Sequence, residues 1–300
     1  MCGIFGTINY RISEEKALDC LNRMIHRGPD GYGIWQEDGV TLGHRRLSIL
    51  DLSENGRQPM SYADGRYEIT FNGEVYNFIE IRRELMSKGY TFKSDTDTEV
   101  IIAAFIEWGE KCLDMFNGMW TFAIWDRLEK KMFISRDRFG IKPLYIANQG
   151  GRIAFASEMK AIMPLLDKTD INRSLIERYL KNPHDEMQDE CLVEEIKRFP
   201  AGFCAWIDAS GNIEMKRWWN TLDHIVDVPA AYEEQVEKFR ELFLDSCRIR
   251  MRSDVTLGTA LSGGLDSSAT ICAMAHIRNG ADNDRVNNDW QHAFVATFAG

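Results

Sequence analysis

The feature that most constrains the fold of this chain is a change in its pattern of predicted elements near residue 225. Before that point the apolar stretches are short, rich in β-branched or aromatic residues, and bounded by Gly, Asp or Asn, which is typical of strands. The predicted strands are 4–8, 32–36, 41–47, 67–71, 120–126, 131–136, 144–147, 153–157, 203–207 and 213–217. Four helices interleave with them, at 15–25, 78–88, 97–108 and 174–180. Many strands with few helices predict sheets that pack face to face under a cover of helices.

Beyond residue 225 the pattern is that of a parallel sheet. A long amphipathic helix over 233–250 comes first, and we expect its apolar side chains to face inward. These side chains are Val236, Phe239, Leu242, Phe243 and Cys247. A strand at 255–261, a glycine turn at 262–264, a helix at 267–277 and a strand at 293–298 follow, which is the start of a doubly wound α/β domain. Since the sequence stops at Gly300, just after a strand, we expect a fragment of a longer protein.

Composition and charge limit the partners. The chain has 36 Lys and Arg against 46 Asp and Glu, and a net charge of −10 repels a sugar-phosphate backbone, so we expect no nucleic-acid partner. No apolar run reaches the ~18 residues that span a bilayer, and the start has no signal-peptide pattern, so we expect no membrane association and a cytoplasmic location. The seven cysteines are scattered without a C-x-x-C pair, which predicts neither disulfides nor a metal held by the protein.

A glycine- and serine-rich segment between a predicted strand and a predicted helix indicates phosphate binding. It reads Leu261-Ser262-Gly263-Gly264-Leu265-Asp266-Ser267-Ser268. Backbone N–H groups in such a turn and the positive end of the following helix together hold an anion, and the glycines let it approach the backbone. An ordinary tight turn is the alternative, and two glycines alone would favour it. The full S-G-G-x-D-S string in this context favours phosphate instead, and no lysine closes it as in the G-x-x-x-x-G-K-[ST] loop.

This string resembles the pyrophosphate-binding loop of the ATP pyrophosphatases, which cleave ATP between the α and β phosphates to adenylate a substrate. The resemblance implies that Ser262, Gly263, Gly264, Asp266 and Ser267 hold the pyrophosphate and that Leu261 lies near the adenosine. Ala296, in the next predicted strand, matches a second adenine contact. Family chemistry also implies Mg²⁺, which would neutralise the leaving pyrophosphate.

The other end of the chain offers a nucleophile. Removal of Met1 would leave Cys2 with a thiol and a free α-amine on one residue. That amine titrates near ~8, so it can act as a base near neutral pH, and an N-terminal amine that activates its own side chain is a known route to covalent catalysis. An early cysteine on its own is usually incidental.

Further motifs give this cysteine a context, because the chain resembles the class II glutamine amidotransferases and, among them, the glutamine-hydrolysing asparagine synthetases. The motifs are Met1-Cys2-Gly3-Ile4, His26-Arg27-Gly28-Pro29-Asp30, Leu42-Gly43-His44-Arg45-Arg46-Leu47-Ser48-Ile49, Phe71-Asn72-Gly73-Glu74-Val75-Tyr76-Asn77, Arg136-Asp137-Arg138-Phe139-Gly140-Ile141-Lys142-Pro143-Leu144-Tyr145, Ala156-Ser157-Glu158-Met159-Lys160-Ala161 and Phe199-Pro200-Ala201-Gly202. The resemblance implies an N-terminal nucleophile-type αββα sandwich over 2–218 that forms a glutaminase domain. It also implies a linker over 219–232 and an incomplete ATP-pyrophosphatase domain over 233–300.

The resemblance also implies roles for individual residues. Cys2 would attack the side-chain amide of glutamine, while Asn72 and Gly73 would donate to the oxyanion. The substrate's zwitterion would be held by Arg46 at its carboxylate and by Glu74 and Asp97 at its ammonium group. Leu47 and Ile49 complete the implied glutamine-binding set.

Several of these residues also have a purely structural interpretation. Asn72-Gly73 is a hairpin signal by itself, and Glu74 could be a surface charge. Arg45 competes with Arg46, and Asp95 competes with Asp97, one of the two aspartates being the expected helix cap. Motif position favours Arg46 and Asp97. His26 is expected to be structural, because the α-amine already provides a base.

Together the two halves imply a carbon–nitrogen ligase. Glutamine hydrolysis would supply ammonia to a carboxylate adenylated by ATP, and aspartate is the leading acceptor, giving asparagine, AMP, pyrophosphate and glutamate. Leu180–Glu190 departs from the family pattern, so an amidotransferase for another carboxylate, in envelope polysaccharide or secondary-metabolite synthesis, is the runner-up. Sugar-phosphate and phosphoribosyl amidotransferases share the Cys-Gly-Ile start but do not fit the Ser262–Ser268 loop. A non-catalytic scaffold protein is a further alternative for the function. For the assembly, a homodimer is a candidate.

Overall fold

The computed structural model describes residues 1–182, 189–280 and 285–297. These residues form two compact units. Unit 1 consists of Met1–Ser48 and Ser53–Asn220, and unit 2 consists of Ile49–Leu52 and Thr221–Gly300.

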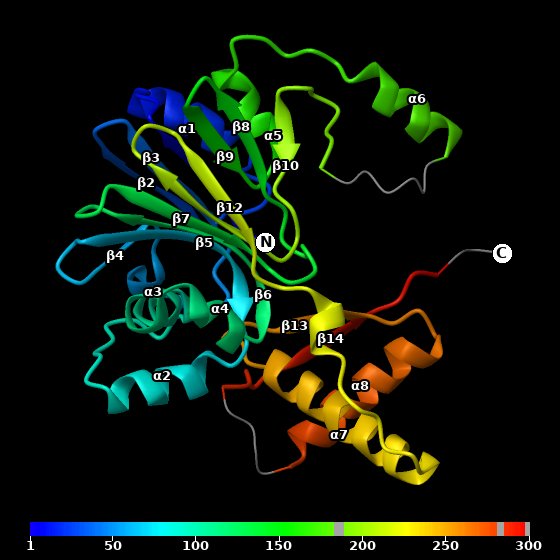
Figure 1. The fold of residues 1–300 in the computed structure, drawn as a ribbon. Coiled ribbons are helices and arrows are strands. Elements are labelled where there is room, and N and C mark those ends of the chain that lie inside the picture. Colours follow the sequence, from blue (N-terminus) through cyan, green and yellow to red (C-terminus); the bar gives the residue numbers. More distant parts are fainter. Residues whose placement is uncertain (183–188, 281–284, 298–300) are drawn as a thin grey trace. The chain divides into compact units, whose positions relative to one another are not determined.

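Unit 1 is built on two six-stranded sheets, in which neighbouring strands are antiparallel (Figure 1). The first sheet, in the order β10-β8-β9-β1-β3-β2, contains β1 (Gly3–Ile8), β2 (Gly31–Glu37), β3 (Val40–Arg46), β8 (Tyr145–Gln149), β9 (Arg152–Ala156) and β10 (Ile196–Arg198). The second, in the order β12-β11-β7-β6-β5-β4, contains β4 (Met60–Tyr62), β5 (Tyr67–Val75), β6 (Gly118–Asp126), β7 (Lys131–Arg136), β11 (Phe203–Asp208) and β12 (Ile213–Arg217).

Helices cover the outer face of each sheet (Figure 1). On the first sheet lie α1 (Glu14–Asn22) and α5 (Met159–Ile162), and on the second lies α3 (Asp97–Trp108), against which α2 (Phe78–Ser87) and α4 (Cys112–Met115) pack. The remaining helices of unit 1 are α6 (Arg173–Lys181) and the 3₁₀ turns η1 (Glu54–Gly56), η2 (Gly109–Lys111) and η3 (Met163–Leu165). The predicted αββα sandwich is therefore confirmed.

The main core of unit 1 lies between the two sheets. Its fully buried side chains include Ile4, Ile8, Leu42, Trp125 and Ile134. Because side chains alternate along a strand, the even-numbered residues of β1 and β3 face this interior.

Two polar contacts join the sheets near one end of the sandwich. The Thr70 hydroxyl donates to the carbonyl of Gly43 at 3.0 Å, and His44 Nε2 lies 3.0 Å from the carbonyl of Phe71. Burial lowers the pKa of His44 to about 3, so the imidazole is neutral and its Nε2–H donates.

Some short elements of unit 1 were not predicted from the sequence. Strands β4 and β10 and helices α4 and α5 were not predicted, because three or four residues are too few to show a period. Helix α1 ends at Asn22, so the prediction of a helix to residue 25 was wrong there, and Ile25 is 53% exposed. Most of the departure from the family pattern at 180–190 falls at 183–188, outside the described residues.

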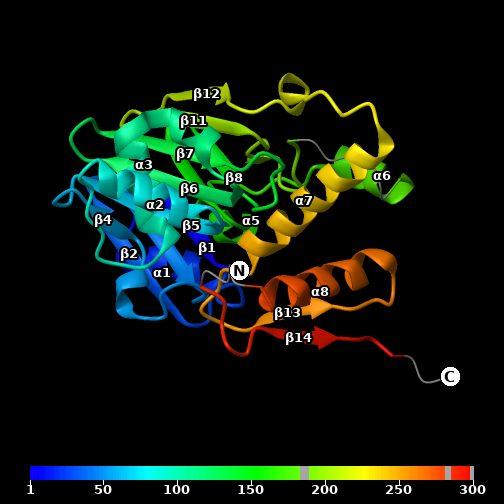
Figure 2. The ribbon, with the colours of Figure 1, turned by 90° about the horizontal axis from the view of Figure 1, so that it is seen from below.

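Unit 2 has one small parallel sheet. Strands β13 (Leu257–Ala260) and β14 (Gln291–Phe294) pair in parallel, α8 (Leu265–Arg278) connects them, and α7 (Tyr232–Arg250) packs on α8 (Figure 2). The turn η4 (Thr221–His224) precedes α7. The predicted strand–turn–helix–strand order is present. The prediction that the apolar face of α7 is inward was wrong for Val236, Phe239 and Leu242, which are 47%, 70% and 59% exposed.

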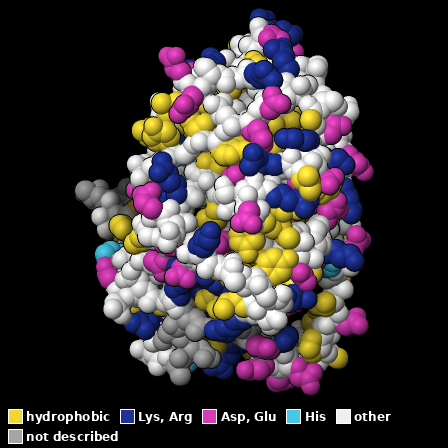
Figure 3. Space-filling view, turned by 90° about the vertical axis from the view of Figure 1, so that its left-hand side faces the viewer, with side chains coloured by type: hydrophobic (Ala, Val, Ile, Leu, Met, Phe, Trp, Pro, Cys, Tyr) yellow, Lys and Arg dark blue, Asp and Glu magenta, His cyan; other side chains and the backbone are white. Residues whose placement is uncertain are grey.

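The surface carries charges of both signs. On the face drawn in Figure 3, acidic and basic side chains are interspersed. Within the described ranges, no helix combines the length and apolar character that crossing a membrane requires.

Candidate active site

Alternation along the strands puts Cys2, the predicted nucleophile, and Arg46, which is predicted to bind the glutamine carboxylate, on the same face of the first sheet. Cys2 immediately precedes β1 and has the parity of Ile4 and Ile8, which belong to the core between the sheets. Arg46, the last residue of β3, has the parity of Leu42 in the same core. The register of β1 and β3 pairs Gly3 with Arg45, so the two residues lie at the same end of the first sheet.

Asn72 reaches this interior from the second sheet. It has the parity of Thr70, whose hydroxyl contacts the first sheet, and it is only 1% exposed. Its Nδ2 atom is buried and has no hydrogen-bond partner among the residues that the structure describes. A buried donor without a partner costs roughly 1–3 kcal/mol, so this amide is suited to an acceptor that arrives with a ligand.

Gly73 occupies a position where the neighbouring backbone leaves no room for a side chain. A Cβ atom there would lie 2.3 Å from the carbonyl oxygen of Met119 and 2.8 Å from the Cα of Trp120. The register pairs Gly73 with Trp120 on β6. The glycine therefore allows β5 and β6 to approach closely beside Asn72, and the interpretation of Asn72-Gly73 as a hairpin turn is wrong because both residues lie within β5.

The Cys2 thiol is half-buried and contacts the backbone of Leu47. Its Sγ accepts from the Leu47 N–H at 3.3 Å and lies 3.5 Å from the Leu47 carbonyl. Burial raises the pKa of the thiol, and the N–H of Leu47 acts in the opposite direction. The terminal amine, carried by Met1 in this chain, has a lowered pKa because of burial, and nearby Arg27 acts in the same direction. Removal of Met1 would put the terminal amine on Cys2 itself, the arrangement in which an amine can serve as the base for its own side-chain thiol.

Arg27 is a member of the site that sequence reasoning passed over. Its Nε donates to the carbonyl of Cys2 at 2.9 Å, its Nη1 lies 3.1 Å from Glu158 Oε1, and its Nη2 is buried without a partner. His26 lies 2.8 Å from the same carboxylate oxygen, which supports a structural part for it. The sequence signal that could have indicated Arg27 is the presence of both the His26–Asp30 motif, which contains it, and the Ala156–Ala161 motif, which contains its partner Glu158.

The structure separates the two adjacent arginines. Arg45 is buried, with its guanidinium bonded to the carbonyl of Leu21 and to the side chain of Asn22. Arg46 Nη1 donates to the carbonyl of Ser53 at 2.8 Å. Arg46 also lines a hollow of about 240 Å³, together with Asp30, Gly31, Tyr32, Glu54, Arg57 and Gln58. Arg45 thus contacts α1, while Arg46 lines this hollow.

The predicted ammonium-binding residues lie at the end of β5 and the start of α3. The carboxylate of Asp97, 5% exposed, accepts from the Val75 N–H at 2.9 Å, next to Glu74. The expectation that an aspartate caps this helix was wrong, because the Thr96 hydroxyl accepts from the Glu99 N–H. Asp95 is exposed and pairs with Arg82 at 3.3 Å.

Ile49 is grouped differently from the rest of the predicted glutamine site. It belongs with Ile49–Leu52 to unit 2, where its carbonyl accepts from the Asp254 N–H at 3.1 Å. The Asp254 carboxylate in turn accepts from the Asp51 N–H at 2.7 Å and pairs with Arg285.

In unit 2 the predicted phosphate loop is exposed and locally organised. Ser262 Oγ and Ser267 Oγ are 3.1 Å apart, and Ser262 Oγ accepts from the Gly264 N–H at 3.3 Å. Gly263 has φ +80°, and Gly264 is the N-cap of α8. The first N–H groups of α8 have no partner within the helix and are directed at the loop.

The adenine contact predicted at Ala296 lies elsewhere than expected. Strand β14 ends at Phe294, so Ala296 follows the strand instead of lying in it, and it is exposed. Leu261 directly follows β13, and its N–H donates to the carbonyl of Phe294 at 2.9 Å.

The described residues were compared with the ligand sets that hold metal ions in proteins. Among them, no group of three or more His, Cys, Asp or Glu side chains is arranged to hold a metal ion. Mg²⁺ commonly binds through substrate phosphates with one or two carboxylates, and the exposed Asp266 beside two serine hydroxyls fits that manner of binding.

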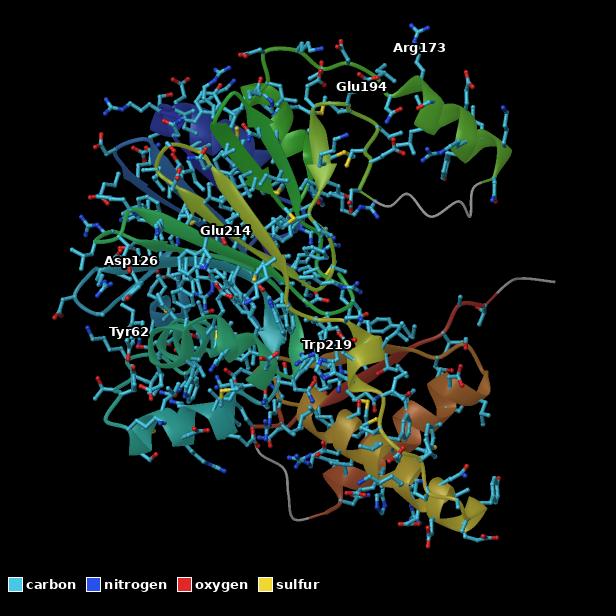
Figure 4. All side chains as sticks on the ribbon, in the orientation of Figure 1. Tyr62, Asp126, Arg173, Glu194, Glu214 and Trp219 are labelled. Atoms are coloured by element: carbon cyan, nitrogen blue, oxygen red, sulfur yellow. The ribbon has the colours of Figure 1, made fainter. Side chains whose placement is uncertain are left out.

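Another hollow, of about 560 Å³, lies on the second sheet away from Cys2. It is lined by Glu110, Asp126, Glu129, Lys131, Trp206, Asp208, Asn212, Ile213 and Glu214 (Figure 4 labels Asp126 and Glu214). Asp126 already pairs with Arg66 at 2.8 Å, and Glu110 accepts from Trp206 at 2.7 Å and pairs with Lys216 at 2.9 Å. Asp126 and Glu110 are therefore already paired within the protein.

Known proteins resemble both units. A glutamine amidotransferase domain model matches residues 1–219, and an asparagine synthase model matches residues 238–300. Asparagine synthetase [glutamine-hydrolyzing] 1 of Bacillus subtilis is 38% identical over 274 residues, covering 89% of this chain and 43% of that protein. Asparagine synthetase B [glutamine-hydrolyzing] of Escherichia coli is 33% identical over 311 residues, covering 100% and 50%. The chain thus spans about half the length of these curated relatives.

The fold has a counterpart among solved structures. Glutamine phosphoribosylpyrophosphate amidotransferase from B. subtilis superimposes with a TM-score of 0.56 at 17% identity, covering 92% of this chain and 64% of that one. This likeness concerns the fold. With the family match over residues 1–219, it shows that the chain belongs to the glutamine amidotransferase domain family.

Proposed function

We propose that this chain carries the glutaminase half, and the start of the ATP-dependent half, of a glutamine-hydrolysing asparagine synthetase. The observation that carries the glutaminase proposal is the buried Nδ2 of Asn72, which has no partner among the described residues and faces the same interior as Cys2 from the opposite sheet. A donor held in place without an acceptor is what oxyanion stabilisation requires. The names and coverage of the relatives support the synthetase half.

In the proposed reaction, the Cys2 Sγ attacks the side-chain amide carbon of glutamine. As the C–S bond forms, the thiol proton passes to the α-amine freed by removal of Met1, and the amide oxygen becomes an oxyanion facing Asn72 Nδ2 and the Gly73 N–H. The amine then gives its proton to the leaving ammonia. Water hydrolyses the thioester, which releases glutamate and restores the thiol. Because burial raises the pKa of the Cys2 thiol, the thiol needs a base to take its proton as the C–S bond forms, and the α-amine has that role.

The substrate is recognised through its charged ends. Arg46 would bind the α-carboxylate, and the carboxylates of Glu74 and Asp97 would bind the α-ammonium group. The guanidinium of Arg27 holds the carbonyl of Cys2 and so fixes the backbone that carries the nucleophile.

Unit 2 would bind ATP through Leu261, Ser262, Gly263, Gly264, Asp266 and Ser267, and Ala296 stays a proposed adenine contact. Mg²⁺ bound with the nucleotide would neutralise charge on the leaving pyrophosphate. Aspartate, once adenylated, would accept the ammonia and become asparagine. We place this chemistry in the cytoplasm, where reducing conditions suit the free thiols, and a homodimer is the proposed assembly. The proposed domains are 2–218 and 233–300, joined by 219–232.

The decisive experiment compares Cys2→Ala with the unaltered protein. We expect glutamate release from glutamine to fall by at least a thousandfold, because no other group forms the thioester. Asparagine formation from ammonium, aspartate and ATP by the protein with a complete synthetase half should persist. Glutaminase activity that survives the substitution, or a glutamine-analogue label on another residue, would refute the nucleophile.

The acceptor needs its own test. ATP–pyrophosphate exchange measured over a panel of carboxylic acids should be greatest with aspartate. Exchange that depends instead on another carboxylate would favour a sister amidotransferase and leave the glutaminase proposal intact.

A further inference from the structure

Gln58 is a buried polar residue to which the proposed reaction gives no part. It lies between η1 and β4 and is 6% exposed. Both ends of its side-chain amide are bonded, because Oε1 accepts from the Phe71 N–H at 2.6 Å and Nε2 donates to the Thr98 hydroxyl at 3.1 Å. Phe71 and Thr98 are themselves buried. A buried amide that is satisfied at both ends is held in one orientation and holds its partners in turn.

The first of these contacts supports a part of β5 that β4 does not reach. Pairing of β4 with β5 stops at Met60 and Ile69. Two residues further along β5, side chains replace the missing strand: Gln58 accepts from the Phe71 N–H, and the His44 Nε2–H donates to the Phe71 carbonyl at 3.0 Å. An unpaired backbone N–H is costly in a buried position, so Gln58 takes the place of a strand partner here.

The supported residue directly precedes the proposed oxyanion donors. The Phe71 carbonyl and the Asn72 N–H belong to one planar peptide unit, so bonds that fix Phe71 also fix the backbone of Asn72. On its other side, β5 pairs with β6 through Asn72 and Gly73. The strand is therefore held from both sides at the point from which the Asn72 side chain reaches the interior.

The backbone of Gln58 packs against the first sheet, which carries Cys2 and Arg46. A Cβ atom at Gly33, on β2, would lie only 2.2 Å from the Gln58 carbonyl oxygen, so this glycine lets the carbonyl approach the strand. Gly33 is the register partner of His44. Gln58 also lines the hollow of about 240 Å³ beside Arg46. One residue thus joins the sheet of the nucleophile with the sheet of the oxyanion donor.

The second contact of the Gln58 amide reaches the start of α3. Its partner Thr98 follows Asp97, the proposed ammonium-binding residue. The Asp97 carboxylate accepts from the Val75 N–H at 2.9 Å, at the end of β5. The start of α3 and the site end of β5 are therefore linked twice, once through Asp97 and once through Gln58.

We propose that Gln58 is a positioning residue for glutamine hydrolysis, which holds β5 so that Asn72 Nδ2 meets the oxyanion formed at Cys2. The inference rests on the proposed glutaminase function. An oxyanion donor is effective only when it is held within about 0.5 Å of its productive position. Because β4 ends before it reaches Phe71, the support that a neighbouring strand would give comes from the Gln58 side chain.

The test compares Gln58→Met with Gln149→Met in steady-state glutamine hydrolysis. Methionine keeps most of the side-chain volume and removes both hydrogen bonds. Because an oxyanion donor acts in the transition state, kcat of Gln58→Met should fall about 10- to 100-fold, while KM changes less than about threefold. Gln149 is the matched control, since it accepts from the Asp167 N–H and donates to the Leu165 carbonyl at the opposite end of the first sheet. Its variant should keep the original kcat.

A double-mutant cycle with Asn72→Ala separates positioning of the amide from general support of the fold. Once the Asn72 amide is removed, its placement no longer matters, so Gln58→Met should lower kcat of the Asn72→Ala protein by less than about threefold. The inference would be overturned by an equal factor in the two backgrounds, by an unchanged kcat in Gln58→Met, or by an equal loss in Gln149→Met.

If Gln58→Met does not fold, as judged by circular dichroism, hydrogen exchange in the unaltered protein decides. The Phe71 amide should exchange as slowly as the β5 amides that are bonded to β6, and exchange more than about tenfold faster would contradict the proposal. An absence of glutaminase activity, or activity that survives Cys2→Ala, would instead count against the proposed function itself.

Discussion

The two units use glycine for different reasons, and the difference shows how each candidate site is held. In unit 1, Gly73 has ordinary strand geometry, but a side chain there would strike the backbone of β6. In unit 2, Gly263 has open space around it, but its φ of +80° disfavours any other residue. The candidate glutaminase site is fixed by tertiary packing, while the candidate phosphate loop is shaped by local backbone conformation.

The hydrogen bonds also differ between the two units: they are long-range in sequence around Cys2 and local in the loop of unit 2. The contacts around Cys2 join residues far apart in the sequence, such as Leu47, Arg27 and, through Arg27, Glu158. The contacts in the phosphate loop join Ser262 with Gly264 and Ser267, at most five residues away. Damage to the first site should therefore spread through the fold, and damage to the second should stay local.

The largest expected effect separates the two glycines. Gly73→Ala should destabilise unit 1 by about 3 kcal/mol or more, because strand backbone cannot yield by the required distance, and glutamine hydrolysis should be lost with it. Gly263→Ala should cost only ~1–2 kcal/mol, the strain of a left-handed alanine, and should lower ATP–pyrophosphate exchange. Calorimetric unfolding combined with both assays makes the comparison. Equal losses of stability in the two variants would contradict the distinction.

This division also explains how far the sequence could lead. Motif strings gave Cys2, Arg46 and Asn72 as candidate site residues, and alternation along β3 puts Arg45 and Arg46 on opposite faces of the first sheet. Arg27 was missed, because its contacts with Cys2 and Glu158 span 25 and 131 residues and no local pattern encodes such pairs.

In unit 2 the periodicity of α7 was real, but it could not say which element covers the apolar face. Phe239 is 70% exposed, although the sequence pattern placed it inward. A period of 3.6 identifies a face of the helix, whereas burial depends on the neighbours that pack there. The extent of β14 was equally beyond local signals, and Ala296 was placed in a strand that ends at Phe294.

A smaller effect should distinguish the two arginines inside unit 1. Arg46→Lys keeps the charge but loses the planar fork, so KM for glutamine should rise about 10- to 100-fold while kcat changes less. Arg45→Lys should leave KM near its original value and lower stability by about 1–2 kcal/mol, because the bonds to Leu21 and Asn22 are lost. Steady-state kinetics and urea unfolding on both variants give the comparison, and an exchange of the two outcomes would reverse the assignment.

The smallest expected effect concerns the contribution of Glu158 to the stability of the fold at acidic pH. Glu158 pairs with Arg27, which in turn donates to the carbonyl of Cys2. Burial alone would raise the pKa of this carboxyl, but hydrogen bonds from Lys160, Arg27 and His26 together lower it. A carboxyl whose pKa is lower in the folded state contributes stability above its unfolded value of about 4.3, and this contribution is lost as the pH falls through the folded value.

Glu158→Gln should therefore reduce stability near neutral pH by about 1 kcal/mol or less and flatten the loss of stability between about pH 5 and pH 3. The measurement is the urea midpoint at several pH values in that range. Glu54→Gln is the matched control, since the Glu54 side chain is 87% exposed and pairs only at 3.5 Å with Arg57. If both variants follow the unaltered protein at every pH, the ion pairs of Glu158 contribute nothing measurable, and Arg27 is held at Cys2 by its backbone contact alone.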